Sequence, residues 1–353
     1  MKILMVGGTW NKENGKESGL INKMYQELKK LTKDITFYNG GKYENLEKII
    51  DSASLFDVIF WMANVDNSLP KVRDIKKVNP YAFVIGSKRN DNNKYSFVEV
   101  LDRALLNRHN LTIQFSKENT NTFKMLVFDP LGTNWYEGYD LNKCVESIYK
   151  RVSFVLTTKR DNTYPTNEEI EIPDNEEFFE YVREVSEIFH KTIEHATGVT
   201  RFLGNASFML GSKDYIYVTR RDVDKRFIDK DHFVGAYLGK DKKTYYSGPY
   251  KPSKDTIVQL HLYKKLSNIK YIIHSHCYVE DAPFTSIPVP CGALDEITEV
   301  MDSIKKDYNN NLELDYYTIN LKGHGCLIMG SNVDILKKTK FLTRHLPEKI
   351  KEE

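Results

Sequence analysis

The chain has 353 residues, of which 41% are hydrophobic and 28% are charged, and its formal net charge is +2. This composition is that of a folded globular protein and argues against a largely disordered one, while the near-neutral charge argues against nucleic acid as a partner. No segment approaches the ~20 consecutive apolar residues of a membrane span. The four cysteines have no CxxC or disulfide-framework spacing, so we expect a cytoplasmic protein.

Residues 1–155 alternate short apolar runs with longer amphipathic stretches, as in a parallel sheet covered by helices. The apolar runs are ILMVGG, ITFYNG, VIFWMAN, YAFVIGS, LTIQF and FKMLVFD. Helices are expected at residues 19–31, 43–53 and 96–107, where apolar residues recur at helical spacing. The pattern predicts an α/β domain with a wound parallel sheet of flavodoxin-like or Rossmann-like type, which by itself implies no function.

A glycine pair, Gly7-Gly8, follows the first apolar run and is predicted to form a strand-to-helix turn. Glycines let a backbone approach a phosphate, and a helix N-terminus offers N–H donors, so a phosphate-binding turn is one interpretation. A tight turn that requires glycine for steric reasons is the other, because the sequence matches neither GxGxxG nor the Walker loop.

A polar stretch with two prolines, residues 156–176, predicts a linker between a first domain at 1–155 and a second domain at 177–353. The second domain is expected to alternate strands with helices. Its predicted strands are SFML, YIYVT, YIIHSH, YTINL and CLIMG. Its predicted helices lie at residues 178–197, 256–265, 295–307 and 333–345.

Three histidines in the second domain indicate a divalent-metal site. His274 and His276 stand two apart at the end of an apolar run, and the period of two places both imidazoles on one face of a strand. His324 lies between Gly323 and Gly325, which leave space around its ring. Three imidazoles with an open fourth position form a catalytic zinc arrangement. Taken alone, a His-x-His pair is equally typical of a hydrogen-bonded surface pair, so the neighbouring motifs decide between the two.

Further sequence blocks accompany these histidines in a fixed order. They are Gly204-Asn205-Ala206-Ser207, Tyr215–Thr219, Pro252-Ser253-Lys254-Asp255-Thr256 with Tyr263, and Ile287-Pro288-Val289-Pro290-Cys291. With the histidines, the segment from residue 201 to about 336 resembles the class II aldolase and adducin head family. That family includes fuculose-phosphate and rhamnulose-phosphate aldolases, ribulose-phosphate 4-epimerase and methylthioribulose-phosphate dehydratase. The resemblance implies an α/β/α domain with a mainly antiparallel sheet, and it does not cover residues 1–150.

The resemblance implies that the three histidines bind Zn2+ or another divalent metal, with Asp255 beside them as ligand or acid/base. It implies a lyase of the aldolase type, acting on a small phosphorylated ketose or hydroxy-carbonyl through an enediolate. Asp281 matches a catalytic aspartate of the epimerase branch, with an exposed acidic pair as the alternative. The resemblance further implies a homo-oligomer, since many relatives are tetramers.

The expected metal site indicates that the reaction passes through an enediolate, but it does not indicate which product is formed. A sugar-phosphate 4-epimerase and a dehydratase would use the same enediolate, so both stay open beside the lyase. A non-catalytic binding module like adducin is a third alternative, although the intact histidine triad argues against it. The family's tyrosine proton donor near the carboxyl end has no counterpart here, because no tyrosine follows Tyr317. Tyr278, Tyr316 and His345 of a neighbouring subunit are the alternatives for that role.

The residues that match the family's phosphate site are Asn205, Thr219, Arg220, Ser253 and Lys254. Three of them keep the family's residue type, whereas Arg220 replaces a glycine and Lys254 replaces a serine. Both replacements add positive charge, so we expect a phosphate or carboxylate of the substrate there. The alternative is that both are surface residues beside a phosphate site that has been lost.

Overall fold

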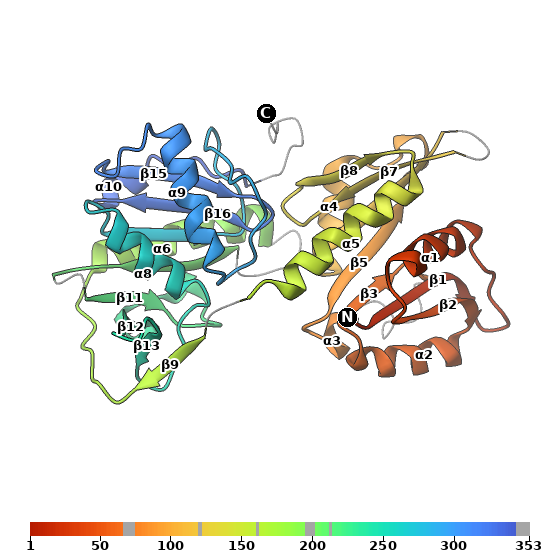
Figure 1. Ribbon diagram of the computed structural model, residues 1–353, viewed down its shortest axis with the longest axis horizontal. Helices are drawn as coiled ribbons and strands as arrows, with labels where there is room; N and C mark the ends of the chain where they lie inside the picture. The colour runs from red at the N-terminus through yellow and green to blue at the C-terminus, as the bar shows by residue number, and fades with distance from the viewer. Residues whose placement is uncertain (66–74, 119–121, 160–161, 195–201, 212–213, 344–353) are drawn as a thin grey trace. The chain divides into compact units, whose positions relative to one another are not determined.

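The structure is a computed structural model, and it describes residues 1–65, 75–118, 122–159, 162–194, 202–211 and 214–343. The chain forms two compact units, Met1–Thr157 and Thr158–Arg344, each with a sheet of its own (Figure 1). Within these described ranges, none of the helices has the length and apolar character of a membrane span.

The first unit contains a mainly parallel sheet. Its strands are β1 (Ile3–Asn11), β2 (Ile35–Lys42), β3 (Val58–Trp61), β4 (Asn64–Val65), β5 (Phe83–Arg89), β6 (Leu111–Lys117), β7 (Phe123–Phe128) and β8 (Asn134–Gly138). Its helices are α1 (Gly19–Leu31), α2 (Tyr43–Asp51), α3 (Ile75–Val78), α4 (Phe97–Leu106) and α5 (Leu141–Thr157), with short turns of helix at Ser52–Leu55 and Asp91–Asn93.

The strands of this sheet run in the order β2-β1-β3-β5-β6-β7-β8, with β4 beside β1. The strands β2, β1, β3, β5 and β6 pair in parallel, and β7 and β8 are antiparallel. The five long parallel strands follow the spatial order of flavodoxin-like sheets. The predicted wound parallel sheet is therefore confirmed.

Alternating side chains of β1 explain why helices cover both faces of the sheet. Ile3 and Met5 pack with α1 and α5, whereas Leu4 and Val6 pack with α2 on the opposite face (Figure 1). A parallel strand that is buried on both faces requires such a continuous apolar run. Ser18 caps the start of the helix α1, and its side chain accepts a hydrogen bond from the N–H of Ile21.

The turn predicted at Gly7-Gly8 is wrong, because β1 continues through both glycines to Asn11. A Cβ atom at Gly8, where φ is +71°, would lie 2.5 Å from the backbone nitrogen of Gly40 and 2.7 Å from the carbonyl oxygen of Lys16. Glycine is therefore needed here because the end of β2 and the loop before α1 pack directly against the strand.

The second unit contains a mainly antiparallel sheet. Its strands are β9 (Thr163–Thr166), β10 (Leu203–Phe208), β11 (Tyr215–Thr219), β12 (Phe233–Leu238), β13 (Thr244–Ser247), β14 (Tyr271–Ser275), β15 (Tyr316–Leu321) and β16 (Gly325–Gly330). Its helices are α6 (Glu176–Phe189), α8 (Thr256–Lys265), α9 (Asp295–Asp307) and α10 (Val333–Leu336), with short helical turns at His190–Glu194, Lys225–Phe227 and Lys230–His232.

The second sheet has the order β15-β16-β14-β10-β11-β12-β13-β9, and only the pair β13 and β9 is parallel among its described strands. The helices α8 and α9 share one apolar core with this sheet. On the other face, α6 places Phe178 and Phe179 against Phe208 and Phe233. The predicted α/β/α domain with a mainly antiparallel sheet is confirmed.

The predicted helix at 333–345 is much shorter in the structure, since α10 ends at Leu336. Beyond it the backbone pairs with the segment after β14: Leu342 N–H donates to Tyr278 O at 2.8 Å, and Glu280 N–H donates to Lys340 O at 2.9 Å. These backbone hydrogen bonds take the place of helical ones after Leu336. The contact with the segment after β14 therefore determines the backbone conformation there. The helix predicted at 178–197 forms α6 and continues directly into the helical turn His190–Glu194, and residues 195–197 lie outside the described ranges.

Part of the predicted linker at 156–176 belongs to the second sheet. Strand β9 pairs in parallel with β13, from Thr163 opposite Thr244 to Thr166 opposite Ser247. Farther on, Ile170 fills the space above Gly235, where a Cβ atom would lie 2.4 Å from the Ile170 Cγ2 atom. Residues 163–170 of the predicted linker therefore pack along the edge of the second unit.

Candidate metal centre

His274 is the most deeply buried of the three predicted ligands. It lies on the inner strand β14, between β10 and β16, and only 1% of its surface is exposed. Its Nδ1 atom is 3.0 Å from the carbonyl oxygen of Cys326. That carbonyl can only accept, so Nδ1 carries the proton and Nε2 offers a lone pair. The Nε2 atom is buried and makes no hydrogen bond.

His324 is oriented by a carboxylate that the sequence did not single out. Its Nδ1 atom lies 2.9 Å from Oε2 of Glu296, a residue in the first turn of α9 that is 1% exposed. Burial raises the pKa of Glu296, while the neighbouring His324 acts to lower it. A carboxylate that accepts from one imidazole nitrogen leaves the other nitrogen to bind an ion, which is the usual support of a metal-binding histidine.

The rings of His276 and His274 converge next to Gly204, where any larger residue would collide with them. His276 is exposed, and its ring lies 5.0 Å from that of His274, centroid to centroid. A Cβ atom at Gly204 would lie 3.1 Å from Nε2 of His274 and 3.2 Å from Nε2 of His276. One ring nitrogen from each of His274, His276 and His324 lies within 4.8 Å of the others. A single ion can therefore reach all three.

Asp255 completes this constellation from the start of α8. Its Oδ2 atom accepts a hydrogen bond of 2.8 Å from Asn205 and lies 3.9 Å from Nε2 of His274. Its Oδ1 atom is buried without a hydrogen bond. Burial acts to raise the pKa of Asp255, but His274 and His324 lower it to about 2. Burial also lowers the pKa of His274 well below its usual value, so the carboxylate is charged and the imidazole neutral, as metal binding requires.

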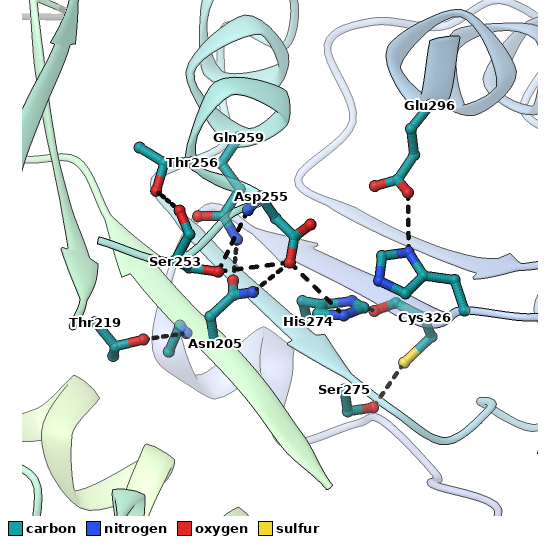
Figure 2. Close-up of polar contacts among 12 residues, drawn as sticks. Asn205, Thr219, Ser253, Asp255, Thr256, Gln259, His274, Ser275, Glu296 and Cys326 are labelled. Carbon is teal, nitrogen blue, oxygen red and sulfur yellow. Dashed lines mark hydrogen bonds and ion pairs between the residues drawn. The ribbon is translucent and has the colours of Figure 1, made fainter. Parts of the chain in front are cut away.

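The residues predicted to bind phosphate separate into two groups in the structure. Two of them, Asn205 and Ser253, support Asp255, whereas Thr219 contacts the backbone of a neighbouring strand (Figure 2). Asn205 binds the carboxylate and accepts a hydrogen bond from Gln259, and the Ser253 hydroxyl lies 3.5 Å from Oδ2 of Asp255. Thr219 Oγ1 accepts a 3.3 Å bond from the backbone N–H of Ala206. Asn205 and Ser253 therefore hold the acid in place through their own hydrogen bonds.

The other two predicted phosphate residues are cationic. Arg220 stacks its guanidinium on Tyr250, 4.0 Å from the ring centroid. Lys254 instead lines a hollow of about 220 Å³. The residues that line this hollow are Asn162, Thr163, Arg221, Lys251, Lys254, Cys291 and Gly292. The lining contains three cations and no carboxylate, so its charge favours an anion. Arg221 and Lys251 were missed by the sequence analysis, although each adjoins a predicted block.

Asp281, the second predicted catalytic acid, is exposed on the turn after β14 with a φ of 57°. It lies outside the groups of converging ligand atoms among the described residues. Both tyrosines considered as proton donors already make hydrogen bonds. The Tyr278 hydroxyl accepts from Gly323 N–H at 2.8 Å, and that of Tyr316 is 2.8 Å from Thr339 Oγ1. His345 lies outside the described residues.

The sequence of the second unit matches a known family. Residues 183–279 match the model of the Class II Aldolase and Adducin N-terminal domain. Residues 183–279 of the second unit are therefore similar to this domain. This match confirms the resemblance found in the sequence, and it includes Asp255, His274 and His276. It does not extend to His324 or to any part of the first unit.

Several solved structures are similar to parts of the chain. An L-fuculose 1-phosphate aldolase has 14% identity over 44% of this chain and 80% of its own, with a TM-score of 0.32. The l-fuculose-1-phosphate aldolase of Thermus thermophilus has 15% identity over 46% of this chain and 84% of its own, with a TM-score of 0.29. A DNA/pantothenate metabolism flavoprotein of Streptococcus pneumoniae has 11% identity over 43% of this chain and 98% of its own, with a TM-score of 0.36. No curated protein matches the sequence.

Proposed function

We propose that the aldolase and adducin domain is a metal-dependent lyase of the aldolase type, acting on a small phosphorylated ketose or hydroxy-carbonyl. The observation that carries this proposal is the convergence of three imidazoles and Asp255 at one place. Buried polar atoms are normally hydrogen-bonded in proteins. Here Nε2 of His274 and Oδ1 of Asp255 are buried without such bonds, which a cation between them would explain.

His274, His276 and His324 would hold this ion, and zinc is the expected one because three imidazoles with a free position suit it. When bound, such an ion polarises a carbonyl oxygen and stabilises the negative charge that develops as a proton or carbon leaves. Asp255 is the proposed acid/base. Asn205 holds its Oδ2 atom, and Oδ1 remains available to take a proton from a substrate hydroxyl.

The cationic hollow supports a phosphorylated substrate. Arg221, Lys251 and Lys254 line it, and charge-assisted hydrogen bonds to phosphate are stronger than neutral ones. Lys254 directly precedes Asp255, and Cys291 of the same lining contacts the Asp255 carboxylate. The hollow therefore adjoins the metal centre. A phosphate bound there would leave the carbonyl end of a short substrate beside the histidines.

Metal analysis and a substrate screen test this proposal on the full chain. We expect about one zinc ion per chain and release of a triose phosphate and an aldehyde from a phosphorylated ketose. A product that keeps all its carbons would instead identify an epimerase, and loss of water would identify a dehydratase. Protein that binds metal but turns over none of these substrates would favour a binding module. The absence of any stoichiometric metal would refute the proposal altogether.

We further propose a cytoplasmic location, on the spacing of the cysteines, and a homo-oligomer, on the family resemblance. Light scattering on the purified full chain measures its mass directly. A mass close to 41.1 kDa, that of one chain, would argue against an oligomer.

A further inference from the structure

A cysteine lies among the atoms of the metal centre. The Sγ atom of Cys291, a carboxylate oxygen of Asp255 and a ring nitrogen of His324 all lie within 4.8 Å of one another. His324 also belongs to the three-histidine group, so the sulfur borders the same centre. We propose that Cys291 is a further protein ligand of the ion and binds it through sulfur. This inference rests on the proposed metal centre and adds a donor that the histidine motif does not contain.

Close chain packing brings the sulfur to this position. Gly292 has a φ of +74°, and a Cβ atom there would lie 2.9 Å from the carbonyl oxygen of Lys254. The backbone next to Cys291 therefore packs directly against Lys254, the residue before Asp255. Four residues beyond Gly292, the same segment provides Glu296, which holds His324. One short segment thus supplies the sulfur and also orients one of the histidines.

The surroundings of Cys291 differ from those of a cysteine that only fills space. Cys277 and Cys326 are 0% exposed, and the Cys326 sulfur lies 3.0 Å from the Ser275 hydroxyl. Cys291 is partly exposed and lines the cationic hollow. The Asp255 carboxylate lies beside it and contacts its thiol. A separate observation, independent of the cysteine, is the buried Nε2 atom of His274, which makes no hydrogen bond and which a nearby cation would satisfy.

The binding step balances in protons and charge. Before an ion binds, the Cys291 sulfur carries a proton, as an ordinary thiol does at neutral pH. When the ion binds, the S–H bond is replaced by a bond from sulfur to the metal, and the proton leaves to solvent. The thiolate then offsets one positive charge of the ion.

A sulfur ligand restricts which metal the centre prefers. Thiolate and imidazole donors favour zinc and related transition metals, whereas magnesium, calcium and manganese prefer oxygen. Zinc is commonly four-coordinate and can accept a fifth ligand. A substrate oxygen can therefore join three histidines and Cys291 without displacing either kind of ligand. The inference accordingly predicts a zinc-type centre and argues against a magnesium enzyme.

Cobalt substitution tests the sulfur ligand without relying on activity. Cobalt(II) bound by thiolate absorbs in the near ultraviolet through charge transfer, whereas cobalt(II) bound only by nitrogen and oxygen does not. We expect this band in the cobalt-loaded full chain. Cys291→Ser should lose the near-ultraviolet band and keep the visible bands of bound cobalt. The matched control Cys144→Ala, in the first unit, should keep both.

The outcomes separate this inference from the proposed function. Stoichiometric cobalt with visible bands but without the near-ultraviolet band would overturn the sulfur ligand and leave the histidine centre standing. A band that persists in Cys291→Ser would overturn it as well. A chain that binds no cobalt would overturn both proposals. If Cys291→Ser does not fold, cadmium NMR of the wild-type chain decides, because a sulfur ligand moves the resonance downfield of the range for nitrogen and oxygen ligands.

Discussion

Buried polar side chains have different surroundings in the two units. In the first unit, Asp129 accepts hydrogen bonds on both carboxylate oxygens, and both polar atoms of the Asn79 amide are bonded to backbone. In the second unit, His274 and Asp255 are buried just as deeply, yet each keeps one atom without a hydrogen bond. A buried atom without a hydrogen bond also occurs in the first unit, at Gln114 Oε1. What distinguishes the metal centre is that such atoms belong to residues whose ligand atoms lie close together, where a bound ion would satisfy them.

The largest expected effect comes from His274→Ala, which removes a ligand from the second unit. We expect bound metal to fall to background, because two histidines remain from a set of three. Metal analysis of the purified variant gives the answer. Asn79→Ala is the matched change in the first unit, and it should lower the free energy of unfolding by roughly 1–3 kcal/mol without altering metal content. If both variants bind metal equally well, the comparison between the units fails.

Acid should destabilise the first unit through His109. Burial lowers the pKa of His109 to about 4, whereas an exposed histidine has a pKa near ~6.5. Between these pH values the unfolded chain binds a proton that the folded unit does not. The free energy of unfolding should therefore fall by roughly 3 kcal/mol as the pH decreases from about 6.5 to about 4.

Tryptophan fluorescence can follow this acid effect in urea, because all three tryptophans lie in the first unit, at Trp10, Trp61 and Trp135. His109→Gln should flatten the pH profile, since glutamine does not titrate. A wild-type profile that is already flat in this range would show that the ring is not buried as described.

A smaller effect is expected for Glu296→Gln. The amide keeps a hydrogen-bond acceptor for His324 but loses the negative charge that increases the basicity of the imidazole. Loss of such supporting partners lowers metal affinity by roughly 10–100-fold. Competition with a zinc chelator measures the change. Asp295→Asn, at the neighbouring position of the same helical turn, is the control and should leave the affinity unchanged.

Removal of one cation from the hollow should weaken substrate binding more modestly. We expect Lys251→Ala to raise KM roughly tenfold, equivalent to about 1.4 kcal/mol, with kcat little altered, because the phosphate is remote from the reacting carbon. Steady-state kinetics with the substrate found by the screen provide the comparison. Lys240→Ala, on the exposed turn between β12 and β13, is the matched control. Equal effects from the two variants would argue for a general charge effect.

The smallest effect is expected for Asp281→Asn if the domain is a lyase. Asparagine tolerates the positive φ of 57° at this position, so the turn is preserved. Activity should then stay close to that of the wild type, since Asp281 is exposed and apart from the metal centre. A large loss of activity with metal retained would favour the epimerase alternative, in which this aspartate transfers a proton.

Local patterns were sufficient to predict most of the fold. The predicted helices at 19–31, 256–265 and 295–307 agree with α1, α8 and α9 in both bounds, because spacing and caps are properties of neighbouring residues. The end of β1 and the end of α10 were not predictable in this way. The first depends on packing against Gly40, and the second on backbone bonds to the segment after β14.

The candidate site was predictable to a similar degree. The three histidines and Asp255 were found because each belongs to a short motif, and the motifs occur in a recognisable order. Glu296 and Cys291 were not assigned to the centre, because the contact of Glu296 spans 28 positions to His324 and that of Cys291 spans 36 positions to Asp255. A pattern of neighbouring residues cannot predict a contact between residues so far apart in the sequence. The block at residues 287–291, before α9, was visible in the sequence, but its role depends on the tertiary fold.

The edge strand β9 has a practical consequence for anyone who separates the two halves of this protein. Residues 163–166 pair with β13, and Asn162 and Thr163 also form part of the wall of the cationic hollow. A fragment that starts at residue 177 would lack that strand and that wall. Excision at about residue 158 preserves both, so the stretch that resembles a spacer in the sequence should be kept with the second unit.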